Sequence, residues 1–304
     1  MTSQKTMTTR AWASMGLLGL IWGGSFLSNR LAIAEAGVAT TVALRVGGAA
    51  VVLWAFVALA RLPVPRERRT WAAFVLMGLL GNVLPFSLIT WGQHSIEVGL
   101  AAILNASTAI MGVLVAALAF RDEVLTPAKA LGVLVGFAGV VVVIGPGALR
   151  GFDLTSLAQL AIVGASLSYA LSGSFARRAF ADVAPEVAAA GMLTGSTLVM
   201  VPAALVLDGW PRAAWSPSVW GAILYLAVVA SALAYLIFYR LIRQVGAGNA
   251  SLTTLLVAPV AIVLGALVYG EQLPWRDYLG FALLALGLLV IDGRAFRARA
   301  EAEA

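Results

Sequence analysis

No cysteine occurs in the 304 residues, and there is one histidine. The lack of cysteine excludes a disulfide framework, a thiolate metal site and thiol redox chemistry. The sequence also lacks an HExxH pair, a phosphate-binding loop that ends in Gly-Lys-Ser or Gly-Lys-Thr, and a nucleophile with a histidine partner. We therefore expect that the protein is not an enzyme and that it holds neither a metal nor a cofactor.

Charged residues are also scarce. They make up 11% of the chain, against about a quarter of an average soluble domain. Hydrophobic residues make up 61%, and the mean hydropathy is +0.96. Apolar runs of about 17–25 residues, long enough to cross a hydrocarbon core about 30 Å thick, recur along the whole chain. The segments between them are too short to form a soluble domain, so the membrane region must carry the function.

Ten apolar segments have the length and spacing of transmembrane helices. The predicted fold is therefore an all-α integral membrane protein with ten transmembrane helices. The expected spans are 12–34, 38–60, 70–92, 98–120, 127–146, 154–176, 186–207, 217–240, 248–269 and 275–292.

The basic residues predict the orientation of these spans. If the N-terminus is cytoplasmic, 15 of the 20 lie on the cytoplasmic side. The outer side has Arg30, Arg150, Arg212 and Arg276, and Arg45 lies within a span. This asymmetry follows the positive-inside rule and predicts that both termini are cytoplasmic in a bacterial inner membrane. Because the basic residues are scattered over span ends, they do not form a nucleic-acid-binding face.

An internal repeat with an offset of about 148 residues divides the chain into halves 1–148 and 149–304. Each half contains five expected helices, and because five is odd, the second half enters the membrane from the opposite side. Such inverted repeats suit alternating access, in which one scaffold opens to either side of the membrane. The matched positions are 120–123 with 269–271, Gly132 with Gly280, and Gly139 with Gly287.

Each half ends on a glutamate, a proline and an apolar helix with a conspicuous glycine. The residues concerned are Glu123, Pro127 and Gly132 in the first half and Glu271, Pro274 and Gly280 in the second. Together with Trp22, Arg45 and Ala258-Pro259, this pattern resembles the ten-helix drug/metabolite transporter superfamily, in its EamA-type branch. Two positions depart from symmetry: Met111 stands opposite Pro259, and Arg45 aligns near Met192.

The resemblance implies a basket of helices around a central cavity and, more often than uptake, the export of small molecules. Within the superfamily, the chain looks most like the branch that exports amino acids, including aromatic ones, and sometimes organic cations. The implied partners are a small-molecule substrate and the lipid bilayer, with the protein a monomer or a homodimer through its fifth or tenth helix. A lipid-linked substrate flippase and a passive channel remain alternatives.

Polar and aromatic side chains within the expected spans are the candidates for substrate binding. Aromatic rings bury apolar substrate surface, while amide and hydroxyl groups bind ammonium and carboxylate groups without a fixed charge, which suits a neutral zwitterion. The alternative is that the hydroxyls bond within their own helices and the aromatic rings only anchor span ends. The candidates are Trp22, Asn29, Asn82, Phe86, Asn105, Tyr169, Ser172, Tyr235, Tyr239 and Thr253, with Thr108 and Ser231 beside them.

Arg45 and His94 are candidates for gating or coupling. Arg45 lies about two turns into its span, where it either contacts a substrate carboxylate or caps carbonyl groups of neighbouring helices. His94, near the outer end of the third span, titrates near neutral pH or is a solvent-exposed loop residue. Because every carboxylate lies at or near a span end, no buried acidic proton relay is visible. We therefore expect facilitated diffusion or coupling through a peripheral group such as His94.

Overall fold

The computed structural model describes residues 7–96, 98–144, 149–150, 153, 156–210, 214–269 and 274–292. These ranges contain helices and short connections and no strand. The first half comprises α1 Thr9–Ile33, α2 Val38–Leu59, α3 Arg68–Gly78, η1 Leu79–Val83, α4 Leu84–Gly92, α5 Val98–Ala119 and α6 Pro127–Ile144. The second comprises α7 Leu157–Ala179, α8 Pro185–Leu207, α9 Pro217–Leu224, η3 Tyr225–Leu233, α10 Ala234–Val245, α11 Ala247–Ser251, α12 Thr253–Tyr269 and α13 Trp275–Asp292.

Eight helical stretches of the described chain are long and apolar enough to cross a membrane. They begin at Thr9, Val38, Arg68, Ala101, Leu157, Pro185, Pro217 and Ala247. Two shorter apolar helices lie at 127–142 and 278–291. Outward-facing apolar side chains, such as Leu118 and Val206, are 90% and 84% exposed, as expected for a surface that faces lipid.

The sixth and eighth expected spans end later than the apolar pattern indicates. The sixth lies at 157–179 rather than 154–176, and the eighth continues to Val245 rather than ending at 240. Both helices extend through arginines, Arg177 and Arg178 in one and Arg243 in the other, which lie in the last turn. Cations in a last turn interact favourably with the helix dipole, so the helices outlast their apolar segments.

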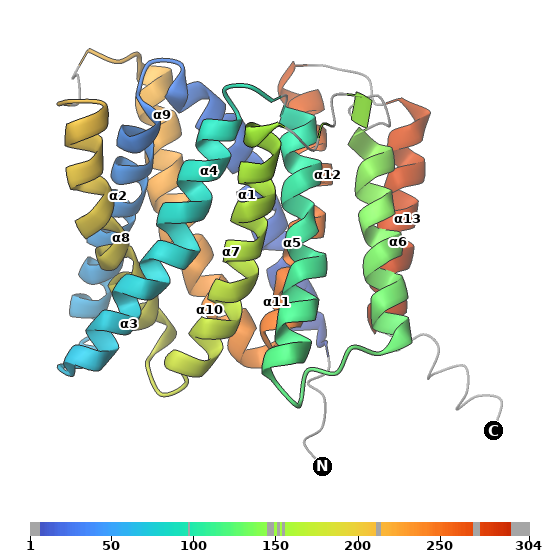
Figure 1. Cartoon of the computed structure of the whole chain (residues 1–304), viewed down its shortest axis with the longest axis horizontal. Helices are drawn as coiled ribbons and strands as arrows, with labels where there is room; N and C mark the ends of the chain where they lie inside the picture. The colour runs from blue at the N-terminus through green and yellow to red at the C-terminus, as the bar shows by residue number, and fades with distance from the viewer. Residues whose placement is uncertain are drawn as a thin grey trace.

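The helices stand side by side in one bundle (Figure 1). We call the end where α1 begins and α13 ends the lower end, as drawn there, and the other end the upper end. Helices α6 and α13 pack against each other at one edge of the bundle. A Cβ atom added to Gly132 would lie 2.6 Å from the carbonyl oxygen of Gly287, and one added to Gly139 would lie 2.8 Å from that of Gly280. Glycine therefore permits this close approach of the two backbones.

Two spans contain π-helical segments, η1 in the third and η3 in the eighth. The wider π-turn disturbs the backbone ladder, and here some of its carbonyl groups accept hydrogen bonds from side chains of other helices. The Ser168 hydroxyl donates to the carbonyl oxygen of Leu80 at 2.7 Å. The indole nitrogen of Trp22 donates to that of Ala230 at 3.1 Å. These segments thus fasten α7 and α1 to the spans that they interrupt.

Candidate functional site

Helices from both halves surround a cavity with a volume of about 100 Å³. Its walls come from α1, α2, α3, η1, α4 and α5 of the first half and from α7, α8, α10, α11 and α12 of the second. The α6 and α13 pair contributes none of the lining residues. The cavity is thus an internal chamber of the bundle, and the edge pair lies outside it.

Most of the residues singled out from the sequence meet at this cavity. The lining includes Trp22, Asn29, Arg45, Phe86, Asn105, Tyr169, Ser172, Tyr235 and Tyr239. It also includes residues for which the sequence carried no separate signal, among them Met77, Met192, Phe238, Ser251 and Thr254.

Three candidates lie elsewhere. Asn82 is fully buried in η1 behind the lining, where it donates to the Ser196 hydroxyl at 2.8 Å and accepts from the Tyr235 hydroxyl. Thr253 is also fully buried, and its neighbour Thr254 lines the cavity in its place. The lining residues Ala247, Ser251 and Thr254 keep the spacing of one helix face across the break at position 252, and Thr253 lies off that face. His94 is exposed in the turn after α4, the loop position considered for it.

The aromatic residues form edge-on pairs across neighbouring helices. The rings of Trp22 and Phe238 have centroids 5.2 Å apart with their planes at 65°. Those of Phe86 and Tyr169 are 6.4 Å apart at 66°. Such T-shaped contacts are favourable for aromatic quadrupoles and hold the rings in place. The wall therefore offers an ordered apolar surface to a bound molecule.

Arg45 places a positive charge on the cavity wall. The residue is 4% exposed, and its Nε atom donates to the Ser231 hydroxyl at 2.9 Å. Its Nη2 atom lies 3.5 Å from the carbonyl oxygen of Ala230, and its guanidinium carbon lies 3.7 Å from the centroid of the Phe86 ring. Within the described residues, no carboxylate pairs with it. The side chain thus both caps a π-helical carbonyl group and lines the cavity.

Two further polar groups of the wall have no hydrogen-bond partner within the described chain. They are the Oδ1 atom of Asn105 and the Oγ1 atom of Thr108, one turn apart on α5. Asn105 is 6% exposed and Thr108 is 3% exposed. Buried polar groups normally have partners, so these two oxygens can bond to a bound molecule if their side chains turn toward the cavity.

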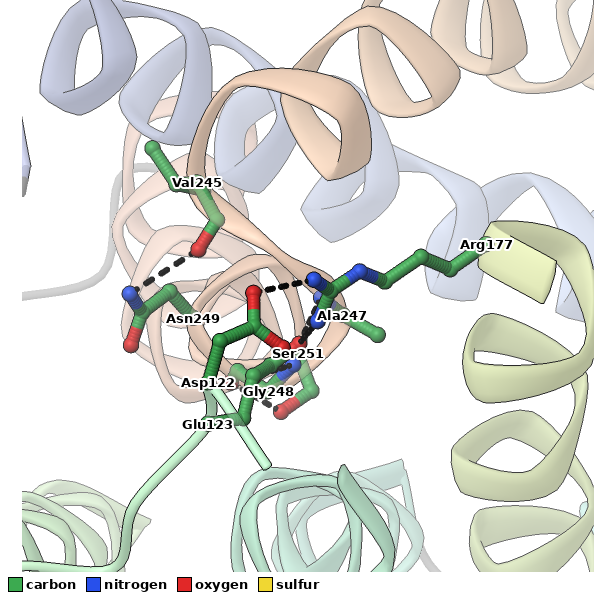
Figure 2. Close-up of polar contacts among 8 residues, drawn as sticks. All are labelled: Asp122, Glu123, Arg177, Val245, Ala247, Gly248, Asn249 and Ser251. Carbon is green, nitrogen blue, oxygen red and sulfur yellow. Dashed lines mark hydrogen bonds and ion pairs between the residues drawn. The ribbon is translucent and has the colours of Figure 1, made fainter. Parts of the chain in front are cut away.

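A cluster of charges joins the two halves at the lower end (Figure 2). Glu123, in the connection after α5, accepts from Arg177 on α7 at 2.6 Å and from the backbone N–H of Ala247 at 2.8 Å with Oε1. Its Oε2 atom accepts from the N–H of Gly248 at 2.8 Å. Asp122 pairs with the same arginine. Glu123 thus accepts three hydrogen bonds from the second half of the chain. Glu271, its counterpart, lies outside the described residues.

Glycine makes room for this carboxylate at the start of α11. A Cβ atom added to Gly248 would lie 2.5 Å from the Glu123 Oε2 atom. Gly246 has φ +87°, a conformation that L side chains rarely adopt. The run of small residues from 246 to 248 was therefore the sequence signal for this contact.

Tyr239 lines both the central cavity and a second one near the lower end. The second cavity has a volume of about 220 Å³. Its walls come from α7, α8 and α10 and from the turn at 180–183. Tyr239 belongs to both linings, and its hydroxyl lies 3.0 Å from the Met192 sulfur.

The upper end is also tied between the halves. The backbone N–H of Thr40 donates to the Asp208 Oδ2 atom at 2.7 Å. The Ser216 hydroxyl and N–H donate to the Glu35 carboxylate at 2.6 and 2.9 Å. These two hydrogen bonds, the hydroxyl's above all, lower the pKa of Glu35. Hydrogen bonds between the two halves of the chain therefore occur at both ends of the bundle.

Comparison with known proteins relates the chain to membrane transporters. The model of the EamA-like transporter family matches residues 10–145 and 156–292. The transporter YvbV of Bacillus subtilis is 24% identical over 97% of this chain and 95% of its own length. A probable terminal-alkyne amino-acid exporter of Streptantibioticus cattleyicolor is 26% identical over 97% of both chains. The inner membrane transporter YedA of Escherichia coli is 24% identical over 90% of this chain and 88% of its own.

A solved crystal structure supports the fold. It superposes with a TM-score of 0.79 at 20% sequence identity, and the match covers 96% of this chain and 99% of the other. At this level of identity, the likeness shows the fold alone.

Proposed function

The chain belongs to the EamA-like transporter family, and from this premise we propose that it exports small metabolites across a bacterial inner membrane. The proposed cargo is a neutral or aromatic amino acid. The observation that carries the proposal is the internal cavity, to which both halves contribute aromatic rings and hydroxyls and the first half adds the amides of Asn29 and Asn105. The relative from Streptantibioticus cattleyicolor, named as a probable amino-acid exporter, supports this class of cargo.

The proposed architecture is ten transmembrane helices in two inverted repeats, 1–148 and 149–304. Two matches of one family model, one in each half, support it. The repeat matches Gly132 with Gly280 and Gly139 with Gly287, so it exchanges the Gly132–Gly287 contact with the Gly139–Gly280 contact. A pseudo-twofold axis requires such an exchange. The π-helical segments also fall in the third span of each half.

The proposed mechanism is alternating access. The lower cluster around Glu123 and the upper contacts of Asp208 and Glu35 join opposite halves of the chain, so opening one end requires breaking one set. By the positive-inside rule, the lower end, with Arg177, Arg178 and most other basic residues, faces the cytoplasm. The central cavity has no carboxylate or histidine in its described lining. Facilitated diffusion is therefore the simplest form of the mechanism.

Counterflow in liposomes tests this function. Purified protein is reconstituted, the vesicles are preloaded with unlabelled phenylalanine or leucine, and the entry of external radiolabelled amino acid is followed with and without a pH gradient. We expect saturable counterflow that needs no gradient. A rate that rises linearly with concentration and shows no counterflow would indicate a channel. A complete lack of amino-acid flux, with counterflow of an organic cation such as tetraphenylphosphonium, would replace the proposed cargo.

A further inference from the structure

We infer that Arg45 binds the carboxylate group of the transported molecule, so that the cavity selects substrates with a carboxylate and an apolar body. This inference rests on the proposed function and narrows its substrate class. Its basis is a buried guanidinium group that lines the cavity and has no acidic partner among the described residues.

An unpaired charge at this depth calls for a counter-charge. Arg45 is the eighth residue of α2, about 10 Å below the upper end of that helix. Charged side chains within a bilayer are costly, and they commonly pair or mark a substrate pathway. The Ser231 hydroxyl and the Ala230 carbonyl oxygen satisfy N–H groups of the guanidinium but do not neutralise its charge. A substrate carboxylate would do so.

The rest of the described lining contains no charged side chain. The field inside the cavity is therefore positive, which attracts anionic groups and repels a molecule whose only charge is positive. An arginine also presents several N–H donors in a planar fork, which matches the two oxygens of a carboxylate. Two of these donors are already directed toward Ser231 and Ala230, and the others remain available.

The unpartnered oxygens on α5 complete the recognition. Asn105 Oδ1 and Thr108 Oγ1 accept hydrogen bonds, and an amino group of the substrate can donate to them once these side chains rotate toward the cavity. Because neither carries a charge, they favour an amino group without requiring one. The aromatic wall of Trp22, Phe238 and Phe86 covers the apolar body. The geometry thus suits an amphipathic amino acid and also an arylalkyl monocarboxylate.

A competitor series on the wild-type protein tests the inference. Counterflow of labelled phenylalanine is inhibited with unlabelled L-phenylalanine, 3-phenylpropionate, L-phenylalaninamide or phenethylamine. We expect the two carboxylates to compete and the amide and amine to be about 10- to 100-fold weaker, the range for a lost charge-assisted hydrogen bond. Equal competition by phenethylamine or phenylalaninamide would overturn the inference while leaving amino-acid transport in place.

A second readout separates this outcome from failure of the proposed function. Ligand-induced thermal stabilisation of the detergent-purified protein is measured with the same four compounds and needs no transport. Stabilisation by 3-phenylpropionate but not by phenethylamine is expected, whatever amino acid is carried. Arg45→Gln should remove this preference, and Arg45→Lys should retain part of it. Arg30→Gln, at an exposed arginine in the last turn of α1, is the matched control and should behave like the wild type. A preference that survives in Arg45→Gln would contradict the inference.

Discussion

Replacement of Glu123 by alanine is expected to destabilise the lower end of the bundle. The carboxylate accepts one hydrogen bond from Arg177 and two from the backbone N–H groups of Ala247 and Gly248. The side chain is 6% exposed, so water satisfies these donors poorly in the native protein. The substitution leaves two backbone donors without partners, while Arg177 keeps Asp122.

The size of the effect follows from these contacts. An unsatisfied buried donor costs about 1–3 kcal/mol, and the loss of a charged partner adds a similar amount. Because the site lies at the bundle end, water can enter the space that alanine leaves and recover part of this free energy. We therefore expect a loss of about 2–4 kcal/mol in the free energy of unfolding, which corresponds to a fall in Tm of about 3–6 °C for a chain of this length.

Thermal unfolding of detergent-purified protein, followed by intrinsic tryptophan fluorescence, measures this change. Glu67→Ala is the matched control, because Glu67 is an exposed carboxylate at the same end and makes no side-chain cap hydrogen bond. Glu123→Gln should lie between the two, since its amide oxygen can still accept from a backbone N–H group. If Glu123→Ala lowers Tm no more than Glu67→Ala does, the cluster does not hold the halves together.

Three other changes should have separable effects. Tyr235→Phe removes a hydroxyl that bonds into the third span. It should lower thermal stability by about 1–3 kcal/mol, the cost of an unmade buried hydrogen bond. Gly132→Ala should cost about 1–3 kcal/mol by overpacking, whereas Gly16→Ala, which meets no atom within 4 Å, should be neutral or mildly stabilising in the same assay. Because Ser216 lowers the pKa of Glu35, their contact stabilises the protein above about pH 4, and the Tm difference between wild type and Ser216→Ala should vanish as the pH falls below the folded-state pKa.

Helix positions could be predicted from the sequence because the hydrophobic pattern records what faces lipid and core. Expected and observed helix ends agree within five residues, and the largest differences occur where arginines extend a helix beyond its apolar segment. The close contacts of Gly132 and Gly139 were also predictable in kind, since small residues two turns apart lie on one helix face and favour backbone approach. Their partners on α13 could not be identified without the packing.

The directions in which individual side chains point were harder to predict. Tyr235 and Tyr239, four residues apart, share a helix face as their spacing predicts, and their ring centroids are 6.1 Å apart. Asn82 does not line the cavity, because a π-helical segment alters the phase that regular α-helical spacing assumes. Thr253 does not line it either, because it lies off the helix face that Ser251 and Thr254 share. The partners of Glu123 could not be identified from the sequence, because any backbone N–H group can donate; the small residues at 246–248 marked only a close approach.

The π-helical segments also determine where a related chain can lose a single residue without a change in its helix faces. A π-turn accommodates one more residue than an α-turn, so deleting one residue within 79–83 or 225–233 can restore a regular helix while the flanking faces keep their direction. The same deletion elsewhere in either span would rotate everything beyond it by about 100° and turn Tyr235 or Phe86 away from the cavity. In alignments with shorter relatives, single-residue gaps should therefore be placed in these two segments. A relative that has such a gap at 225–233 would lose the carbonyl acceptor that Trp22 and Arg45 share.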